Sequence, residues 1–225
     1  HTSPRLGGVY ERGRLRFHAS YGEAFRAPNF VDLYYPFYGN PDLEPETTRS
    51  TELGAALRSD DLEVGLTAYR NRLINLIQGA PPTFLAANVG RARTEGLEGS
   101  LRWRHGIYSI DSSLSLLDAQ DTATGQALLR RPQRTASLVA TASPGPLALA
   151  LTAIWVGERA DVDPASFARR DNPGYQRFDI ATRWRARPWL VPRCRVENLT
   201  DERYEEVLGF PAPRRRLVAG LSLEF

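Results

Sequence analysis

The amino-acid sequence predicts an all-β fold, an antiparallel transmembrane β-barrel. Apolar and polar residues alternate with a period of two through most of the chain, which is typical of strands with two different faces. The connections between these segments alternate between short and long. The longest strongly apolar run, 147–156, is about half of the roughly 20 residues that a membrane-spanning helix needs, so membrane helices are not expected.

Six strands are expected in the first half of the chain. They lie at 4–10, 14–21, 51–57, 62–68, 95–103 and 108–116, and the first of them is the weakest. The strand at 14–21 has Leu15 and Phe17 on one face and Arg16 and His18 on the other. Tyr69 departs from the phase of its strand and indicates a bulge or a strand end.

Five further strands are expected in the second half. They lie at 135–142, 147–155, 177–184, 194–199 and 215–225. No segment has a convincing helical period, so no helix is expected. The total is about eleven strands.

The connections alternate strictly in length. Tight turns are expected at 11–13, 59–61, 104–106, 143–146 and 186–189, and long loops at 22–49, 71–88, 118–132, 157–174 and 198–214. If each connection joins antiparallel neighbours, all tight turns lie at one end of the sheet and all long loops at the other. Outer-membrane barrels have this asymmetry, with short periplasmic turns and longer extracellular loops.

The two faces also suit a barrel in lipid. Aromatic residues stand near strand ends in the apolar phase, as interfacial girdles do: Tyr21 and Trp155 at the long-loop end, and Tyr10, Trp103, Tyr108, Trp184 and Phe225 at the other. The alternative is a soluble β-sandwich binding domain, whose strands also alternate. Small residues on the apolar face, such as Ala19, Ala55 and Gly99, are tolerated against lipid and less useful in a sandwich core.

Composition narrows the function classes further. The chain has 225 residues, a formal net charge of +3 and a pI near 9.2, and its basic residues are scattered arginines, so no nucleic-acid partner is expected. One cysteine, Cys194, rules out an intramolecular disulfide. The chain begins with His1 and contains no methionine, so we expect a piece of a longer protein or a processed product.

Several segments resemble successive landmarks of one family. They are SYGEAFRAPNFVDLY, GNPDLEPETTRSTELG, AYRNRLINLI, NVGRARTEGLEGSLRW and VENLTDERYEEVLGFPAPRRRLVAGLSLEF. In this order they are similar to TonB-dependent outer-membrane transporters over most of the chain. ALLRRPQRTASL and VGERADVDPASFARRDNPGYQRFD look most like the cobalamin receptors of that family. Arg214 departs from the pattern, because many relatives have Gly between Pro213 and Arg215.

The resemblance implies a 22-stranded barrel that holds an N-terminal plug and works with the TonB complex in the bacterial cell outer membrane. Residues 1–225 would form the C-terminal half of that barrel, without the plug and the N-terminal strands. Its two edge strands would then need partners, and the chain would not transport by itself. Expected partners are outer-membrane lipid, the plug with the remaining strands, TonB through the plug, and a ligand. The resemblance implies cobalamin as the ligand, or alternatively a ferric siderophore.

The long loops are the expected place for ligand capture. Flat rings supply large contact area at low entropic cost, and nearby polar groups fix orientation. The candidates are Tyr34, Tyr35, Phe37, Tyr38, Asn40, Phe84, Arg159, Tyr175, Tyr204 and Phe210. For each ring, packing or interfacial anchoring is the competing role. The terminal Phe225 resembles the signal by which barrel proteins are recognised for assembly.

Catalysis and metal binding find little support. The histidines are His1, His18 and His105, and none stands in a long loop beside a nucleophile, so no catalytic residue is assigned and an outer-membrane barrel enzyme remains an alternative only. Asp161, Asp163 and Asp171 offer oxygen ligands for calcium, but aspartate in a proline-containing loop more often shapes turns. No metal and no cofactor is expected.

Overall fold

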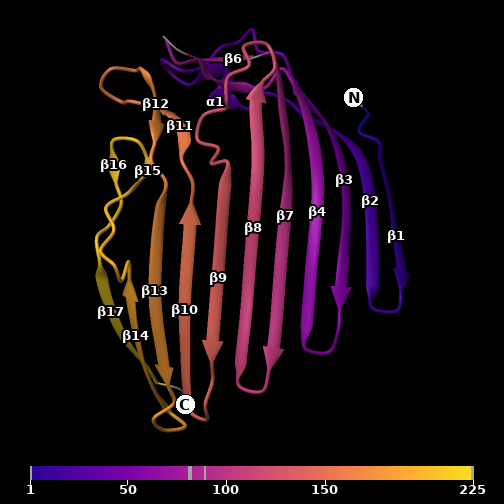
Figure 1. Cartoon of the computed structure of the whole chain (residues 1–225). Coiled ribbons are helices and arrows are strands. Elements are labelled where there is room, and N and C mark those ends of the chain that lie inside the picture. The colour runs from indigo at the N-terminus through magenta and orange to yellow at the C-terminus, as the bar shows by residue number, and fades with distance from the viewer. Residues whose placement is uncertain (1, 81–82, 89, 224–225) are drawn as a thin grey trace.

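The computed structural model describes residues 2–80, 83–88 and 90–223. Its main feature is one eleven-stranded antiparallel sheet in which every strand pairs with the next strand of the meander (Figure 1). The strands, in order, are β1 (Arg5–Arg12), β2 (Leu15–Arg26), β3 (Glu46–Arg58), β4 (Leu62–Ile74), β7 (Arg91–His105), β8 (Tyr108–Asp121), β9 (Arg134–Ala142), β10 (Leu147–Val156), β13 (Tyr175–Trp184), β14 (Leu190–Glu197) and β17 (Arg216–Leu223). The predicted eleven strands and single all-β sheet are confirmed, and a two-sheet sandwich is excluded for the described residues.

Several strands run further than the alternation predicts. β3 begins at Glu46 rather than at residue 51, and β7 begins at Arg91 rather than at 95. The ladder between β3 and β4 is continuous from Arg58↔Glu63 to Thr47↔Ile74. Backbone pairing therefore continues past the apolar band into charged sequence, because each strand needs its neighbour's hydrogen bonds whatever the side chains are.

The apolar face lies outward along the whole sheet. Across β2, β3, β4 and β7, Phe17, Ala55, Leu66 and Gly99 stand directly opposite one another. Large apolar side chains are exposed there, and Leu66 keeps 56% of its surface accessible. Such a band is stable only against lipid or another apolar surface.

The inward face is polar and held by ion pairs. His18 Nε2 lies 3.0 Å from Glu52 Oε1, and Arg102 Nε donates to Asp111 Oδ1 over 3.0 Å. The His18 ring also lies against the backbone of Gly54, where an added Cβ would come within 2.1 Å of the ring. The His18 ring is therefore held between the backbone of Gly54 and the carboxylate of Glu52.

Tyr69 does not mark a bulge or a strand end, as its phase had indicated. The ladder between β4 and β7 is unbroken from Leu62↔Trp103 to Ile74↔Arg91, and Tyr69 pairs with Gly96 within it. The phenol lies on the inward face over Gly96, where a Cβ would come within 2.8 Å of the hydroxyl oxygen. A ring that covers a strand glycine occupies the space of the missing side chain.

The two ends of the sheet differ as predicted. Tight turns join the strands at one end, and all long connections lie at the other (Figure 1). Among the residues that the structure describes, the long loops contain one helix, α1 (Phe30–Tyr34), and three two-stranded hairpins: β5 (Ile77–Ala80) with β6 (Leu85–Asn88), β11 (Arg159–Val162) with β12 (Arg169–Asn172), and β15 (Glu205–Val207) with β16 (Phe210–Pro211). No helix of the described residues is long and apolar enough to span a membrane.

The helix α1 contradicts the expectation that the chain has none. Its capping box explains it: Asp32 N donates to Asn29 Oδ1 over 2.9 Å, and Asn29 N donates to Asp32 Oδ2 over 3.1 Å. Arg26 pairs with the same Asp32 carboxylate over 2.8 Å. Five residues are too few to show a helical period, so periodicity could not detect it.

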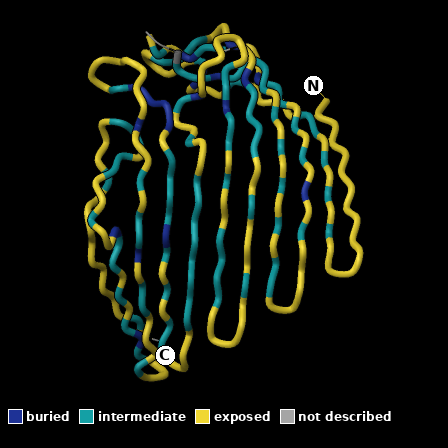
Figure 2. Tube along the Cα trace, in the orientation of Figure 1, coloured by how far each residue is buried: buried dark blue, intermediate teal, exposed yellow. Residues whose placement is uncertain are grey.

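Buried residues gather under the long loops and also occur within the main sheet (Figure 2). Ala153 on β10, Asp179 on β13 and Val191 on β14 are buried in the sheet. One small core contains Leu43, Ile77 and Ala86, with Tyr38 packed against it. A second contains Ala92, Ala119 and Leu128. The loops are therefore folded over the end of the sheet and positioned by their own packing.

Candidate ligand site at the long-loop end

Five loop segments that are distant in sequence line one cavity of about 560 Å³ at the long-loop end. Its walls are Tyr38, Gln78, Gly79, Phe84, Leu129, Arg130, Arg131, Val162, Pro164, Phe167, Leu208 and Phe210. This volume lies within the range of small-molecule sites, which are concave and mostly apolar with a few polar groups. Convergence of all five segments on one space makes it the candidate ligand site.

Aromatic rings form the apolar part of the cavity. Phe84 and Phe167 lie with ring centroids 5.1 Å apart at an interplanar angle of 47°. Both residues have positive φ, 56° and 55°, in loops that connect two short hairpin strands. These tight turns direct both rings into the same space, where they offer a surface for an apolar or planar ligand.

Two adjacent arginines form the polar part. Arg130 donates from Nε to Asp161 Oδ1 over 2.9 Å. Arg131 is exposed and makes no hydrogen bond or ion pair within the part of the chain that the structure describes. One guanidinium is thus neutralised by a buried carboxylate, and the other remains available to an acceptor on a ligand.

Asp161 holds three of the lining loops together. Its side chain is fully buried. Besides Arg130, it accepts hydrogen bonds from the amides of Val162 and Leu208, each over 2.8 Å, and Asn172 Nδ2 lies 3.5 Å from Oδ2. Burial raises the pKa of this carboxyl, but the hydrogen bonds from Leu208, Arg130 and Val162 outweigh it and hold the pKa below its usual value. A charged carboxylate therefore links hairpins β11–β12 and β15–β16 to the loop of Arg130.

Three predicted residues meet beside the cavity without lining it. Tyr175 and Tyr204 stack with centroids 4.1 Å apart, and Arg159 Cζ lies 5.9 Å from the centre of the Tyr175 ring. Arg159 is only 6% exposed and donates to the carbonyls of Glu205 and Glu206 over 2.6 and 2.8 Å. Their contacts position hairpin β15–β16, so their visible role is to support the site.

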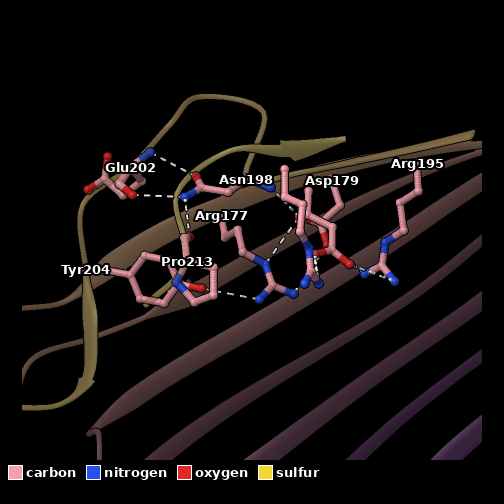
Figure 3. A network of polar contacts seen from close by, with 9 residues as sticks. Arg177, Asp179, Arg195, Asn198, Glu202, Tyr204 and Pro213 are labelled. Carbon is pink, nitrogen blue, oxygen red and sulfur yellow. Dashed lines mark hydrogen bonds and ion pairs between the residues drawn. The ribbon is translucent and has the colours of Figure 1, made fainter. Parts of the chain in front are cut away.

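A polar network fastens the last long loop to the sheet (Figure 3). Asn198 is buried and has a positive φ of 52°. Its backbone N donates to Asp179 Oδ1 over 2.9 Å, and its side-chain Oδ1 accepts from Glu202 N over 2.9 Å. Asn198 Nδ2 donates to the carbonyls of Glu202 and Pro213 over 2.9 and 3.3 Å. Arg195 Nη2 donates to Asp179 Oδ2 over 3.1 Å. The network therefore positions Tyr204 and the residues that follow it.

The remaining predicted residues lie outside the cavity. Tyr34, Tyr35 and Phe37 are exposed, and Phe37 keeps 97% of its surface accessible. Asn40 is structural, since Nδ2 donates to the Ala86 carbonyl over 3.0 Å. Phe225 lies outside the described residues. Of the ten loop candidates, the structure brings Tyr38, Phe84 and Phe210 to the cavity.

Sequence reasoning missed most of the polar lining. A single arginine or glutamine in a loop forms no pattern, so the sequence does not single out Arg130, Arg131 or Gln78. Phe167 lies between Ser166 and Ala168, with no apolar alternation around it, so only its ring marks it. Only the meeting of separate loops identifies these residues.

Two of the three aspartates considered for calcium, Asp161 and Asp163, have other roles. Asp163 accepts hydrogen bonds from the amides of Ala165 and Ser166, over 2.9 and 2.8 Å, and so shapes its own turn. Asp161 accepts the hydrogen bonds from Arg130, Val162 and Leu208 that are described above. Within the described ranges, no group of three or more His, Cys, Asp or Glu side chains is placed to hold a metal ion.

Comparisons with known proteins agree with this architecture. The family described as TonB dependent receptor-like, beta-barrel matches residues 1–199. The vitamin B12 transporter BtuB of Vibrio vulnificus (strain YJ016) is 30% identical over 210 residues, which are 91% of this chain and 33% of that protein. The chain thus spans about a third of the length of this curated relative.

Solved structures share the fold. A ferric enterobactin receptor (PfeA) mutant from Pseudomonas aeruginosa matches with a TM-score of 0.81 and 22% identity, over 99% of this chain and 40% of that one. The copper transporter OprC matches with a TM-score of 0.82 and 20% identity, over 98% and 38%. The ferric-catecholate import receptor Fiu of E. coli K12 matches with a TM-score of 0.79 and 18% identity, over 98% and 34%.

These findings explain the apolar outward band, the polar inward face and the long loops at one end. The chain is part of a receptor barrel of the bacterial outer membrane, and the family is one of transporters rather than enzymes. The eleven-stranded sheet, together with the match over residues 1–199, shows that this chain belongs to the family of TonB-dependent receptor β-barrels.

Proposed function

We propose that this chain is the C-terminal half of the barrel of a TonB-dependent transporter for cobalamin, and that the long-loop cavity is part of its outer ligand site. The observation that carries the proposal is the convergence of five loop segments on one cavity lined by Phe84, Phe167 and two arginines. A site of this kind suits a bulky ligand with flat apolar surface and polar groups at its edge.

The proposed domain arrangement follows from the sheet. Eleven strands are half of a 22-stranded barrel, and this chain covers 33% of the matched vitamin B12 transporter and 40% of the matched enterobactin receptor. The missing half would supply the remaining strands and a plug within the barrel. Contact with TonB would be made through that plug, and energy for uptake would enter there.

Cobalamin is the first choice of ligand because the matched curated relative is a vitamin B12 transporter. A corrin ring edged by amides and one phosphodiester would place apolar surface against Phe84 and Phe167. Its polar edge would then face Arg131. A ferric siderophore is the second candidate, favoured by the same unpaired Arg131, since many iron chelates are anionic.

Binding to the full-length receptor tests the choice. Cyanocobalamin should bind at micromolar concentration or tighter, and Phe84→Ala should weaken binding by about tenfold, because a buried aromatic contact is lost. The matched control is Phe37→Ala, which removes an exposed ring outside the cavity and should leave affinity unchanged. If cobalamin does not bind at micromolar concentration and a ferric siderophore does, the siderophore becomes the preferred ligand and the cobalamin proposal is wrong.

A further inference from the structure

Three arginines stand in one row on the outward face, where lipid is expected. In the register of the sheet, Arg49 on β3 lies directly opposite Arg72 on β4, and Arg72 lies directly opposite Arg93 on β7. Arg70 lies one row closer to the apolar band. Like charges directly opposite each other on a sheet are destabilising unless something neutralises them.

Neighbouring carboxylates neutralise this row only in part. Arg49 pairs with Glu23 over 3.1 Å and Arg70 with Glu95 over 3.3 Å. Arg93 approaches Glu95 and Asp118 at 3.7 and 3.6 Å, and its Nε is buried without a hydrogen-bond partner. Arg72 is exposed, and no carboxylate of the described residues pairs with it.

A groove of about 590 Å³ runs beneath these side chains. It is lined by Tyr21, Arg49, Thr51, Leu53, Ala68, Tyr69, Arg70 and Arg72. Leu53 and Ala68 belong to the apolar band, and they lie directly opposite each other below Thr51 and Arg70. The groove is therefore apolar towards the middle of the sheet and cationic towards the long-loop end.

We propose that this groove binds a phosphorylated lipid of the outer leaflet, with its headgroup phosphate between Arg49 and Arg72 and an acyl chain along Leu53 and Ala68. A guanidinium presents a fork of N–H donors that fits phosphate oxygens, and two guanidiniums on adjacent strands can share one phosphate. The direction of the groove matches an amphiphile in the membrane, since the acyl chain enters the apolar band while the phosphate stays at the interface. The site rests on the outward face alone and does not depend on which ligand the loops take up.

Lipid binding to the full-length receptor in mild detergent tests this site. The probe is bis-phosphorylated, hexa-acylated lipid A, measured by native mass spectrometry and by titration. Arg72→Gln should weaken binding about fivefold, because an arginine near the interface contributes about 1 kcal/mol. The pair Arg49→Gln with Arg72→Gln should weaken binding further, but not by the product of two single losses, because both side chains contact one phosphate. Arg72→Lys keeps the charge but loses the fork of donors, so its affinity for the lipid should lie between those of the wild type and Arg72→Gln.

The matched control is Arg12→Gln, which removes an outward arginine at the opposite end of the sheet, opposite Leu15. It should leave lipid binding unchanged. Heat-modifiable migration on a gel verifies that each variant has folded. Lipid A stripped of both phosphates should bind at least tenfold more weakly than the intact probe.

Three results would overturn the proposal. Equal losses in Arg12→Gln and Arg72→Gln would show general surface attraction, and equal binding of the dephosphorylated lipid would show that the phosphate plays no part. Binding of inorganic phosphate with the affinity of the lipid would show a free-anion site instead. Loss of lipid in Phe84→Ala, with Arg72→Gln unaffected, would place the lipid in the loop cavity.

Discussion

Asp161 shows how one side chain can fix several loops. Its buried carboxylate accepts hydrogen bonds from Arg130 and from the Val162 and Leu208 amides, which belong to three separate loop segments. Removing an acceptor from buried donors leaves each donor unpaired, which costs more than the bond itself contributes. The shape of the cavity therefore depends on this carboxylate remaining ionised.

The stability of the loop assembly should depend on pH through Asp161. Because the pKa is lower in the folded state, this contribution is complete above the ordinary aspartate pKa of about 3.9 and declines as pH falls below that value. Protection of the Val162 and Leu208 amides, followed by hydrogen exchange and corrected for intrinsic rates, should decrease below about pH 4. In Asp161→Asn, protection should already be lower at pH 7 by about 1–3 kcal/mol and should lose this acid dependence. Asp163→Asn is the control, and an unchanged acid dependence in Asp161→Asn would contradict the assignment.

Gly96 should be intolerant of a side chain. An added Cβ would come within 2.3 Å of the Leu116 carbonyl oxygen, a backbone atom that cannot move aside, and within 2.8 Å of the Tyr69 hydroxyl. Gly96→Ala should destabilise the full-length receptor by about 1–3 kcal/mol, as overpacking does. The midpoint of heat-modifiable migration measures this. Gly99→Ala, whose Cβ would meet only Leu114 Cβ at 3.8 Å, should behave like the wild type; equal midpoints in both variants would refute the clash.

At the scale of single elements, period-two alternation was sufficient to find every strand of the main sheet. It could not find where strands end, because β3 and β7 continue through charged residues, where only the backbone pairing with a neighbour maintains the strand. The alternation also does not predict the short strands and the helix within the loops. Hairpin β11–β12 contains the fully buried Asp161 and gains its stability from neighbouring loops, not from a local pattern.

The candidate site was predictable to the same limited extent. Aromatic composition identified Tyr38, Phe84 and Phe210, since rings in polar loops are conspicuous. It also selected Phe37, which the fold leaves fully in solvent. Whether a loop ring faces a cavity depends on the relative placement of five segments, and no local sequence carries that information.

The loop that follows β14 depends on Asn198. This residue combines a left-handed backbone with four hydrogen bonds, to Asp179, Glu202 and Pro213. Asn198→Gly keeps the backbone conformation and loses the side-chain bonds, so we expect faster proteolysis of residues 198–214 in the full-length receptor. Asn198→Ala adds backbone strain and should be cleaved faster still. Equal cleavage of both variants and the wild type would show that the loop is held by other contacts.

At the scale of the whole molecule, the sheet has two free edges. β1 is exposed along its whole length, and β17 is exposed at every described position except Ser222. Each edge presents unpaired backbone groups, and neither bilayer nor detergent tails can supply hydrogen bonds for them. We therefore expect that the eleven strands alone are not a stable membrane-spanning unit, which is consistent with the proposed half-barrel.

The isolated chain should accordingly fail to form a closed barrel. Refolded in detergent, it should become rich in β-structure yet associate into dimers or larger species, because pairing of β1 or β17 with another copy satisfies the edges. A bilayer recording should detect no stable monomeric pore. Supplying the N-terminal strands and plug as a second polypeptide should restore a heat-modifiable receptor that binds the same ligand as the full-length protein, since the edges then find their proper partners. The same test on the full-length receptor controls for the refolding procedure. A refolded chain that remains monomeric and conducts ions would contradict the proposed half-barrel.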